Sequence, residues 1–451
     1  MSKGFLSCAG LLLALLCSGA AHGASFQPCD DAGTQATLNG SLCARETAPL
    51  SHASPGSEQL SLFIRKFPAH GARKGTVWLV AGGPGESGAS LYPFIDRLRR
   101  SFPGFDLMVP DHRGTGLSSR LCPAEEAAGS AGGMALAGAE WASCFSYLNA
   151  QPERARQFTI TNAAHDLRAL ILRHRDEKPV YVYGVSYGTQ LVLRALQIGA
   201  LPIKGLVLDS LVPLETAERW DLSRRSLVVD DVGRQVLAHC DADPRCAAVT
   251  HEPAADLYRR VLAAQASGKD VNLPRLMGSM LDVPAQRARI PYLLRDLDQG
   301  RTEELARVKA GLQQAGAALG DYPQSPPSIP LVAIISGSEN NLRPGLSAAA
   351  LKEEEERLLF SSPLPGMLLQ PGLPRYPRDA WFGRHPAWLP PTLVLHGTLD
   401  PKTHFNGAIE HVAVLRKAGR VTLVEVADAP HFILWTAPDH FERAVRAFVA
   451  D

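Results

Sequence analysis

The sequence VYVYGVSYGT occupies residues 180–189 and joins two segments of different character. Residues 180–185 form a continuous apolar run, which is typical of a buried parallel strand. Residues 187–198 place their apolar side chains at helical spacing. The turn between them reads Gly184-Val185-Ser186-Tyr187-Gly188, a G-x-S-x-G pattern. This pattern between a strand and a helix predicts that Ser186 is a nucleophile.

The two glycines of this turn have a physical role. They leave room for a strained backbone around Ser186 and allow its hydroxyl to stand above the sheet. The N-terminus of the following helix adds free N–H groups and a positive dipole. The alternative is a glycine-flanked serine in an ordinary loop, which can have the same sequence pattern by chance. The neighbouring strand and helix favour the nucleophile.

Further apolar runs extend the pattern along the chain. They lie at residues 76–82, 105–110, 203–208, 392–396 and 421–426. Helical patterns lie between them, so the sequence predicts an α/β fold around a mostly parallel sheet with helices on both faces. Residues 213–385 differ, because they contain mainly helical patterns and proline-rich loops. We therefore expect a helical cap at 213–385, inserted between core segments 25–212 and 386–451.

Composition excludes several classes of protein. The chain has 451 residues, of which 45% are hydrophobic and 20% charged, as in ordinary globular proteins. These values exclude a mainly disordered chain. Lys and Arg total 46 and Asp and Glu total 45, so the formal net charge is +1. This balance, with no basic tract, predicts no nucleic-acid partner.

The N-terminus predicts export. Residues 11–16 are apolar but too few to cross a bilayer, and small residues follow at 19–21. Residues 1–24 are therefore expected to be a cleaved signal peptide, and the mature chain to be secreted or periplasmic. A buried N-terminal helix is the alternative, which the lack of a polar face disfavours. No later stretch is long and apolar enough to span a membrane.

Six cysteines lie beyond the predicted signal peptide. An even count in an exported chain favours disulfides, and six cysteines allow 15 pairings. Proximity in sequence suggests Cys29–Cys43, Cys122–Cys144 and Cys240–Cys246. No tandem CxxC spacing suggests zinc.

A serine nucleophile needs a base, and the base needs a carboxylate to orient it. Asp400 follows the run 392–396, and His431 follows the run 421–426. Asp400 could instead cap a helix, and His431 could be an ordinary histidine of a surface loop. The order Ser, Asp, His favours a triad. The competing histidines are His396, His404, His411 and His440.

Acyl transfer also requires donors for an oxyanion. The backbone N–H of Tyr187 is one candidate, since it follows the nucleophile. The glycine-rich loop at 81–88 should provide the other, and Gly83 is our choice. A phosphate-binding loop is disfavoured because the Lys and Ser/Thr of that motif are missing. This chemistry needs no metal and no organic cofactor.

Five motifs together resemble a known family. They are AGGPGESG at 81–88, DHRGTGLSS at 111–119, GVSYGT at 184–189, HGTLDP at 396–401 and PHF at 430–432. Their order resembles the proline iminopeptidase and tripeptidyl aminopeptidase group, the S33 serine peptidases of the α/β-hydrolase fold. The resemblance covers residues 75–212 and 386–451 and is loose in the cap. Ala81 and His112 depart from the family, which often has His and Gln there.

The resemblance implies a serine exopeptidase whose partner is a peptide with a free N-terminus. Ser186 would be the nucleophile, His431 the base and Asp400 the orienting acid. It also implies that Glu339 binds the substrate ammonium; a solvated loop glutamate is the alternative. The sequence leaves open the number of residues released, any preference for proline and the oligomeric state.

Two rival functions use the same residues. A carboxylesterase or lipase-like hydrolase would have the same triad, because ester and amide hydrolysis share the acyl-enzyme route. A non-catalytic binding protein would usually lack a triad residue, and here all three residue types are present.

Overall fold

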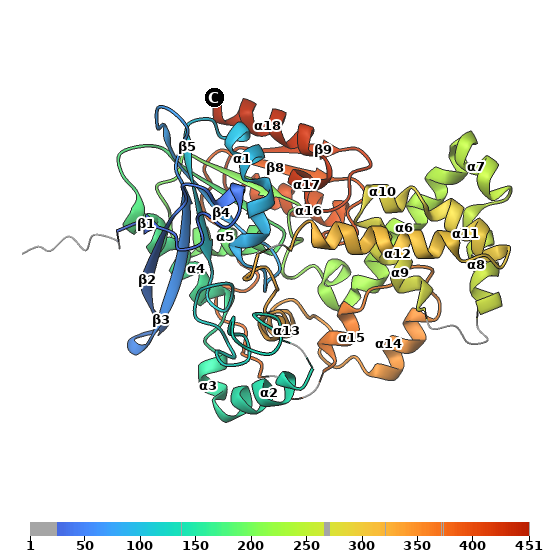
Figure 1. Ribbon diagram of the computed structural model, residues 1–451, viewed down its shortest axis with the longest axis horizontal. Helices are drawn as coiled ribbons and strands as arrows, with labels where there is room; N and C mark the ends of the chain where they lie inside the picture. Colours follow the sequence, from blue (N-terminus) through green and yellow to red (C-terminus); the bar gives the residue numbers. More distant parts are fainter. Residues whose placement is uncertain are drawn as a thin grey trace, which may run out of the picture.

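The computed structural model describes residues 25–136, 138–265, 271–320, 322–370, 372 and 374–450. The predicted signal peptide, residues 1–24, lies outside this range. The described residues build a nine-stranded sheet in the order β1-β2-β3-β5-β4-β6-β7-β8-β9 (Figure 1). Its strands are β1 (Gln27–Pro28), β2 (Leu42–Ser51), β3 (Ser54–Phe67), β4 (Gly75–Val80), β5 (Phe105–Asp111), β6 (Val180–Val185), β7 (Gly205–Asp209), β8 (Thr392–Gly397) and β9 (Val421–Val426).

The predicted parallel sheet is confirmed. Strands β5, β4, β6, β7, β8 and β9 are parallel neighbours, whereas β1, β2 and β3 add antiparallel pairs at one edge. The hairpin of β2 and β3 was not predicted. In β2 buried and less buried residues alternate, and Pro49 and charged side chains interrupt the apolar pattern that identifies a strand.

Helices cover both faces of the sheet, as predicted. Helices α1 (Ile95–Ser101) and α18 (Pro438–Ala450) pack on one face, against Leu79, Tyr183 and Val207. Helices α4 (Ile160–His174), α5 (Tyr187–Ile198) and α16 (Phe405–Leu415) pack on the other, against Trp78, Val182 and Leu208. The two sets of sheet residues alternate along each strand, because successive side chains point to opposite faces.

The described residues between β7 and β8 form helices and no strand. The helices are α6 (Arg225–Ala242), α7 (Pro244–Thr250), α8 (Ala254–Gln265), α9 (Leu273–Leu281), α10 (Pro284–Arg287), α11 (Ile290–Asp298), α12 (Glu303–Ala317), α13 (Ile329–Ser338), α14 (Ala348–Glu355) and α15 (Leu364–Leu368). Most of them lie to one side of the sheet (Figure 1) and have a core of their own that includes Tyr258, Met277 and Phe360. The limits 213 and 385 of the cap stay a prediction.

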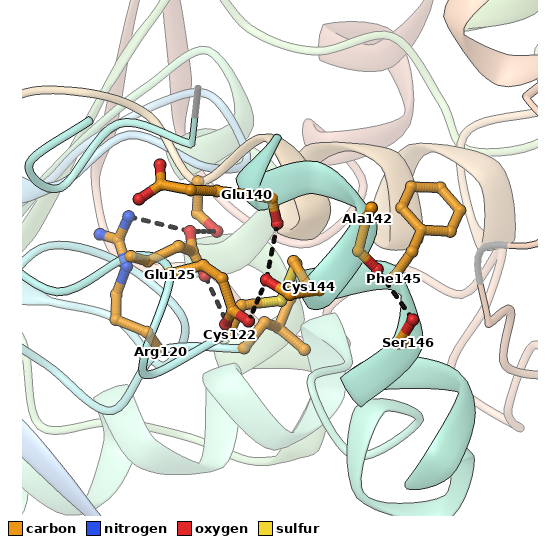
Figure 2. Close-up of a disulfide and its surroundings, with 12 residues drawn as sticks. Arg120, Cys122, Glu125, Glu140, Ala142, Cys144, Phe145 and Ser146 are labelled. Carbon is orange, nitrogen blue, oxygen red and sulfur yellow. Dashed lines mark hydrogen bonds and ion pairs between the residues drawn. A yellow bond between two sulfur atoms is a disulfide. The ribbon is translucent and has the colours of Figure 1, made fainter. Parts of the chain in front are cut away.

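The three disulfides predicted from proximity are confirmed: Cys29–Cys43, Cys122–Cys144 and Cys240–Cys246. Figure 2 shows that Cys122–Cys144 joins the loop that carries Arg120 to helix α2 (Glu140–Ala150). Within the part of the chain that the structure describes, no helix is both long and apolar enough to cross a membrane.

Candidate active site

Four loops meet at the carboxyl ends of the parallel strands. Ser186 follows β6 directly, and residues 81–88 follow β4. Asp400 comes three residues after β8, and His431 lies in the loop after β9. Because these strands are parallel, their carboxyl ends share one edge of the sheet, where α/β proteins bind their ligands.

The turn at Ser186 has the strained geometry that its glycines predict. Ser186 has φ 53° and ψ −125°, outside the regions that ordinary residues prefer. A Cβ atom on Gly184 would lie 2.8 Å from the carbonyl oxygen of Gly188. One on Gly188 would lie 2.5 Å from the carbonyl oxygen of Val80. Both glycines are therefore required for close packing, which explains the G-x-S-x-G pattern.

Asp400 and His431 form the predicted pair. His431 Nδ1 lies 2.8 Å from Asp400 Oδ2, and the aspartate is fully buried. Backbone N–H groups of Lys402 and Thr403 donate to Oδ1 at 2.7 and 2.8 Å, and the Thr403 hydroxyl donates to Oδ2 at 2.8 Å. Burial alone would raise the pKa of Asp400, but His431 and these donors hold the pKa well below its ordinary value. Asp400 is therefore an anion that orients the imidazole.

Asp209, the last residue of β7, and Ser210, the next residue, fix the histidine loop. The Asp209 carboxylate accepts the N–H groups of Ile433 at 2.8 Å and Leu434 at 3.0 Å. The Ser210 hydroxyl accepts the N–H of Phe432 at 2.8 Å. Sequence reasoning missed Asp209, Ser210 and Thr403. The sequence could have indicated Asp209 and Ser210, because they also lie at the carboxyl end of a strand.

The predicted oxyanion loop is held from two sides. Gly83 has φ 111°, and a Cβ atom there would lie 2.2 Å from the backbone nitrogen of Gly85. The carbonyl of Gly85 accepts the N–H of Ser328 at 2.9 Å. The N–H of Gly88 donates to Asp111 at 2.7 Å. The loop is therefore preorganised, and the donor roles of Gly83 and Tyr187 stay predictions.

Two neighbours of this loop have structural roles. The guanidinium of Arg113 pairs with Asp166, with Nε 2.6 Å from Oδ2. His112 packs beside the Tyr187 ring at 5.6 Å between centroids. Burial lowers the pKa of His112 to about 4, so its imidazole is neutral at neutral pH.

Three of the four competing histidines are held by other groups, although His396 Nε2 also lies 3.5 Å from Asp400 Oδ2. The fourth, His440, is exposed on helix α18. His396 Nε2 lies 2.6 Å from the carbonyl oxygen of Thr403, and His404 Nε2 lies 2.8 Å from Asp231. His411 Nδ1 lies 2.7 Å from the carbonyl oxygen of Val212, and burial lowers its pKa to about 4. These bonds give the three rings structural roles.

Ser186 opens into a cavity of about 530 Å³, here called the main cavity. His431 also lines it, together with the apolar side chains of Leu222, Leu319, Val332, Leu364, Phe432 and Trp435. Four charged residues complete its wall: Glu86, Arg225, Asp282 and Lys402. A smaller space of about 60 Å³, the side cavity, shares Gly83, Ser186, Arg225 and Lys402 with it and reaches Tyr187.

The polar groups of the main cavity are only partly paired. Lys402 Nζ lies 3.3 Å from Asp282 Oδ2. Among the described residues, the side chains of Glu86 and Arg225 have no hydrogen bond and no ion pair. The hydroxyls of Ser90 and Ser336 are buried on the same wall without a partner there. This wall therefore has free capacity for a polar ligand.

Glu339 is placed differently from its predicted role. The residue is 2% exposed, and it lines neither cavity within the described part of the chain. Its Oε2 accepts from Arg194 at 3.0 Å and its Oε1 from the Tyr376 hydroxyl at 2.9 Å. Both carboxylate oxygens are engaged inside the protein, so this geometry gives the predicted substrate contact no support.

The fold defines a class of protein, and sequence comparison agrees. A family profile described as the alpha/beta hydrolase fold matches residues 75–310, more than half of the chain. The chain belongs to the α/β-hydrolase fold family. Within the described residues, no group of three or more His, Cys, Asp or Glu could hold a metal ion.

Individual relatives are more distant. Serine protease Hip1 of Mycobacterium tuberculosis and of Mycobacterium bovis is 33% identical over 96 residues, which cover 21% of this chain and 18% of Hip1. A proline iminopeptidase-related protein from Thermus thermophilus is 14% identical, covering 90% of this chain and 97% of its own, with a TM-score of 0.41. An esterase from Rhodococcus sp. ECU1013 has the same identity and TM-score, covering 90% and 98%.

Proposed function

We propose that this chain is an exported serine exopeptidase, an aminopeptidase that releases residues from peptide N-termini through an acyl-enzyme on Ser186. The observation that carries the proposal is the main cavity at the triad, whose wall combines free charged groups with buried hydroxyls. A peptide end offers an ammonium group and amide groups to such a wall, whereas a simple alkyl ester leaves most of it unpaired.

The acylation step follows from the triad. The Ser186 hydroxyl oxygen attacks the scissile carbonyl carbon, and its proton passes to Nε2 of His431. Asp400 stabilises the resulting imidazolium, since its carboxylate lies 2.8 Å from Nδ1. The tetrahedral oxyanion would accept the N–H groups of Gly83 and Tyr187. The C–N bond then breaks, and His431 returns the proton to the leaving amine.

Deacylation repeats the sequence with water. His431 removes a proton from water, whose oxygen attacks the ester carbonyl of the acyl-enzyme. The bond to Ser186 Oγ breaks and the serine recovers its proton. The free amino acid or short peptide leaves.

Two further observations support the class and the compartment. The match to serine protease Hip1, although it covers 18% of that protein, favours amide substrates. Three disulfides favour an oxidising compartment, which agrees with the signal peptide expected at residues 1–24.

The test compares aminoacyl-arylamides that have a free α-amine, their N-acetyl counterparts and a short-chain aryl ester. The wild type should cleave the free-amine amides, and Ser186→Ala should abolish this activity while melting at the wild-type temperature. Cleavage of the ester alone would reject the aminopeptidase and favour a carboxylesterase. Amide cleavage that survives in Ser186→Ala would reject the nucleophile.

A further inference from the structure

Glu86 is a charged residue of the main cavity to which neither the triad nor the oxyanion loop assigns a role. It lies in the loop at 81–88, three residues after Gly83, and its side chain lines the cavity with Ser186 and His431. Among the described residues it has no hydrogen bond and no ion pair. A carboxylate in this position lacks a hydrogen-bond donor from the protein, so a donor group of a ligand can supply the missing partner.

The surroundings of Glu86 shift the pKa of its carboxyl group. Burial raises the pKa of Glu86, while the positive charges of Lys402 and His431 act in the opposite direction. Lys402 already has a closer partner in Asp282 at 3.3 Å. A cationic group of the ligand would supply the missing partner and remove the desolvation penalty.

Glu86 is also close to the nucleophile. The position that a Cβ atom would take on Gly82 lies 3.3 Å from Glu86 Oε2 and 3.2 Å from Ser186 Cβ. One methyl group would therefore touch both side chains. A cation that binds Glu86 can therefore lie near the carbonyl carbon that Ser186 attacks.

We propose that Glu86 binds the α-ammonium of the substrate and that its closeness to Ser186 limits the acyl group to one residue. The inference rests on the proposed aminopeptidase function and names its specificity residue. In an aminoacyl group, only the Cα atom separates the ammonium nitrogen from the scissile carbonyl. Each further residue moves that nitrogen away by up to about 3.3–3.6 Å.

The other charged residues of the cavity do not fit this role. Asp282 is an anion but is paired with Lys402. The Arg225 side chain has no partner among the described residues, but it has the same sign of charge as an ammonium group. Glu339 is bonded to Arg194 and Tyr376 away from the cavity. Glu86 is thus the free anion beside the nucleophile.

The test measures kcat/KM of wild type, Glu86→Gln and Asp282→Asn for three arylamides: free alanyl, N-acetylalanyl and free trialanyl. The wild type should prefer the free alanyl substrate to both others. Glu86→Gln should lose about 10–100-fold on that substrate and change less than about twofold on the N-acetyl one. Asp282→Asn, which also removes a carboxylate from the cavity, should keep the wild-type ratio of free to acetylated substrate.

Three results would overturn the proposal. They are an unchanged ratio of free to acetylated substrate in Glu86→Gln, an equal fall of this ratio in Asp282→Asn, and a wild-type preference for trialanyl over alanyl arylamide. Labelling of Ser186 by a fluorophosphonate checks that Glu86→Gln is folded and reactive. A wild type that cleaves no free-amine arylamide would reject the proposed function itself, and Glu86 would then lose its assigned ligand.

Discussion

Two parts of the active site differ in how completely their polar groups are paired. In the part that holds the predicted triad, here called the first wall, Asp400 accepts bonds from three protein groups besides its contact with His431. In the part of the cavity lining that includes Glu86 and Arg225, here called the second wall, these two side chains have no hydrogen bond and no ion pair among the described residues. The polar groups of the first wall are paired before substrate binds, whereas those of the second wall gain their partners from the substrate.

This difference separates chemistry from recognition. Preorganised groups lose no free energy to rearrangement during the reaction, so the proposed triad would benefit from complete pairing. Recognition groups must instead be free to exchange water for ligand. Substitutions on the first wall should therefore lower the rate for every substrate, and those on the second wall should change the preference among substrates.

The largest effect is expected for Asp400→Asn. The amide removes the negative charge that stabilises the His431 imidazolium, so kcat should fall about 10⁴-fold for amides and esters alike. Steady-state kinetics at several pH values would measure the loss. Asp439→Asn, which changes an 81% exposed carboxylate on α18, is the control and should leave kcat unchanged. A loss confined to free-amine substrates would contradict the assignment of Asp400 to the first wall.

A smaller loss is expected for Gly83→Ala. The new Cβ atom cannot occupy a point 2.2 Å from the Gly85 nitrogen, so the loop must shift and its N–H must move away from the oxyanion. We expect kcat to fall about 10²–10³-fold, with KM little changed. Gly56→Ala is a matched control, because a Cβ atom there meets nothing within 4 Å. Full activity in Gly83→Ala would exclude Gly83 as an oxyanion donor.

The smallest effect is a change in stability from Glu86→Gln. Burial raises the pKa of Glu86 in the folded state, so the unfolded chain releases this proton at lower pH. Folding is therefore destabilised as pH rises from the unfolded-state pKa to the folded-state pKa, and the penalty is complete above the folded-state pKa. Glu86→Gln should melt about 1–2 °C higher at pH 7.5, and the gain should vanish near pH 4. A gain that is equal at both values would contradict a raised pKa.

The sequence predicted the first wall better than the second. Ser186, Asp400 and His431 each follow an apolar run, and parallel strands bring such positions to one edge whatever lies between them. The disulfides were also found, because each links cysteines that are near in sequence.

The second wall depends on packing between distant segments. Glu86 shares the main cavity with Ser336 and Trp435, and no local pattern shows that these residues meet. Glu339 was assigned by resemblance, but pairing with Arg194 depends on how α5 and α13 pack together. The antiparallel strands β2 and β3 were missed because Pro49 and charged side chains interrupt their apolar pattern.

The rate at which a fluorophosphonate labels Ser186 tests the central claim most directly, because this reaction needs the nucleophile and its base but no substrate ammonium. Peptide mapping by mass spectrometry would locate the adduct in wild type, Glu86→Gln and His431→Ala. We expect labelling at Ser186, a rate within about twofold of wild type in Glu86→Gln, and almost none in His431→Ala. An adduct elsewhere, or an equal loss of rate in both variants, would contradict the division between a catalytic wall and a recognition wall.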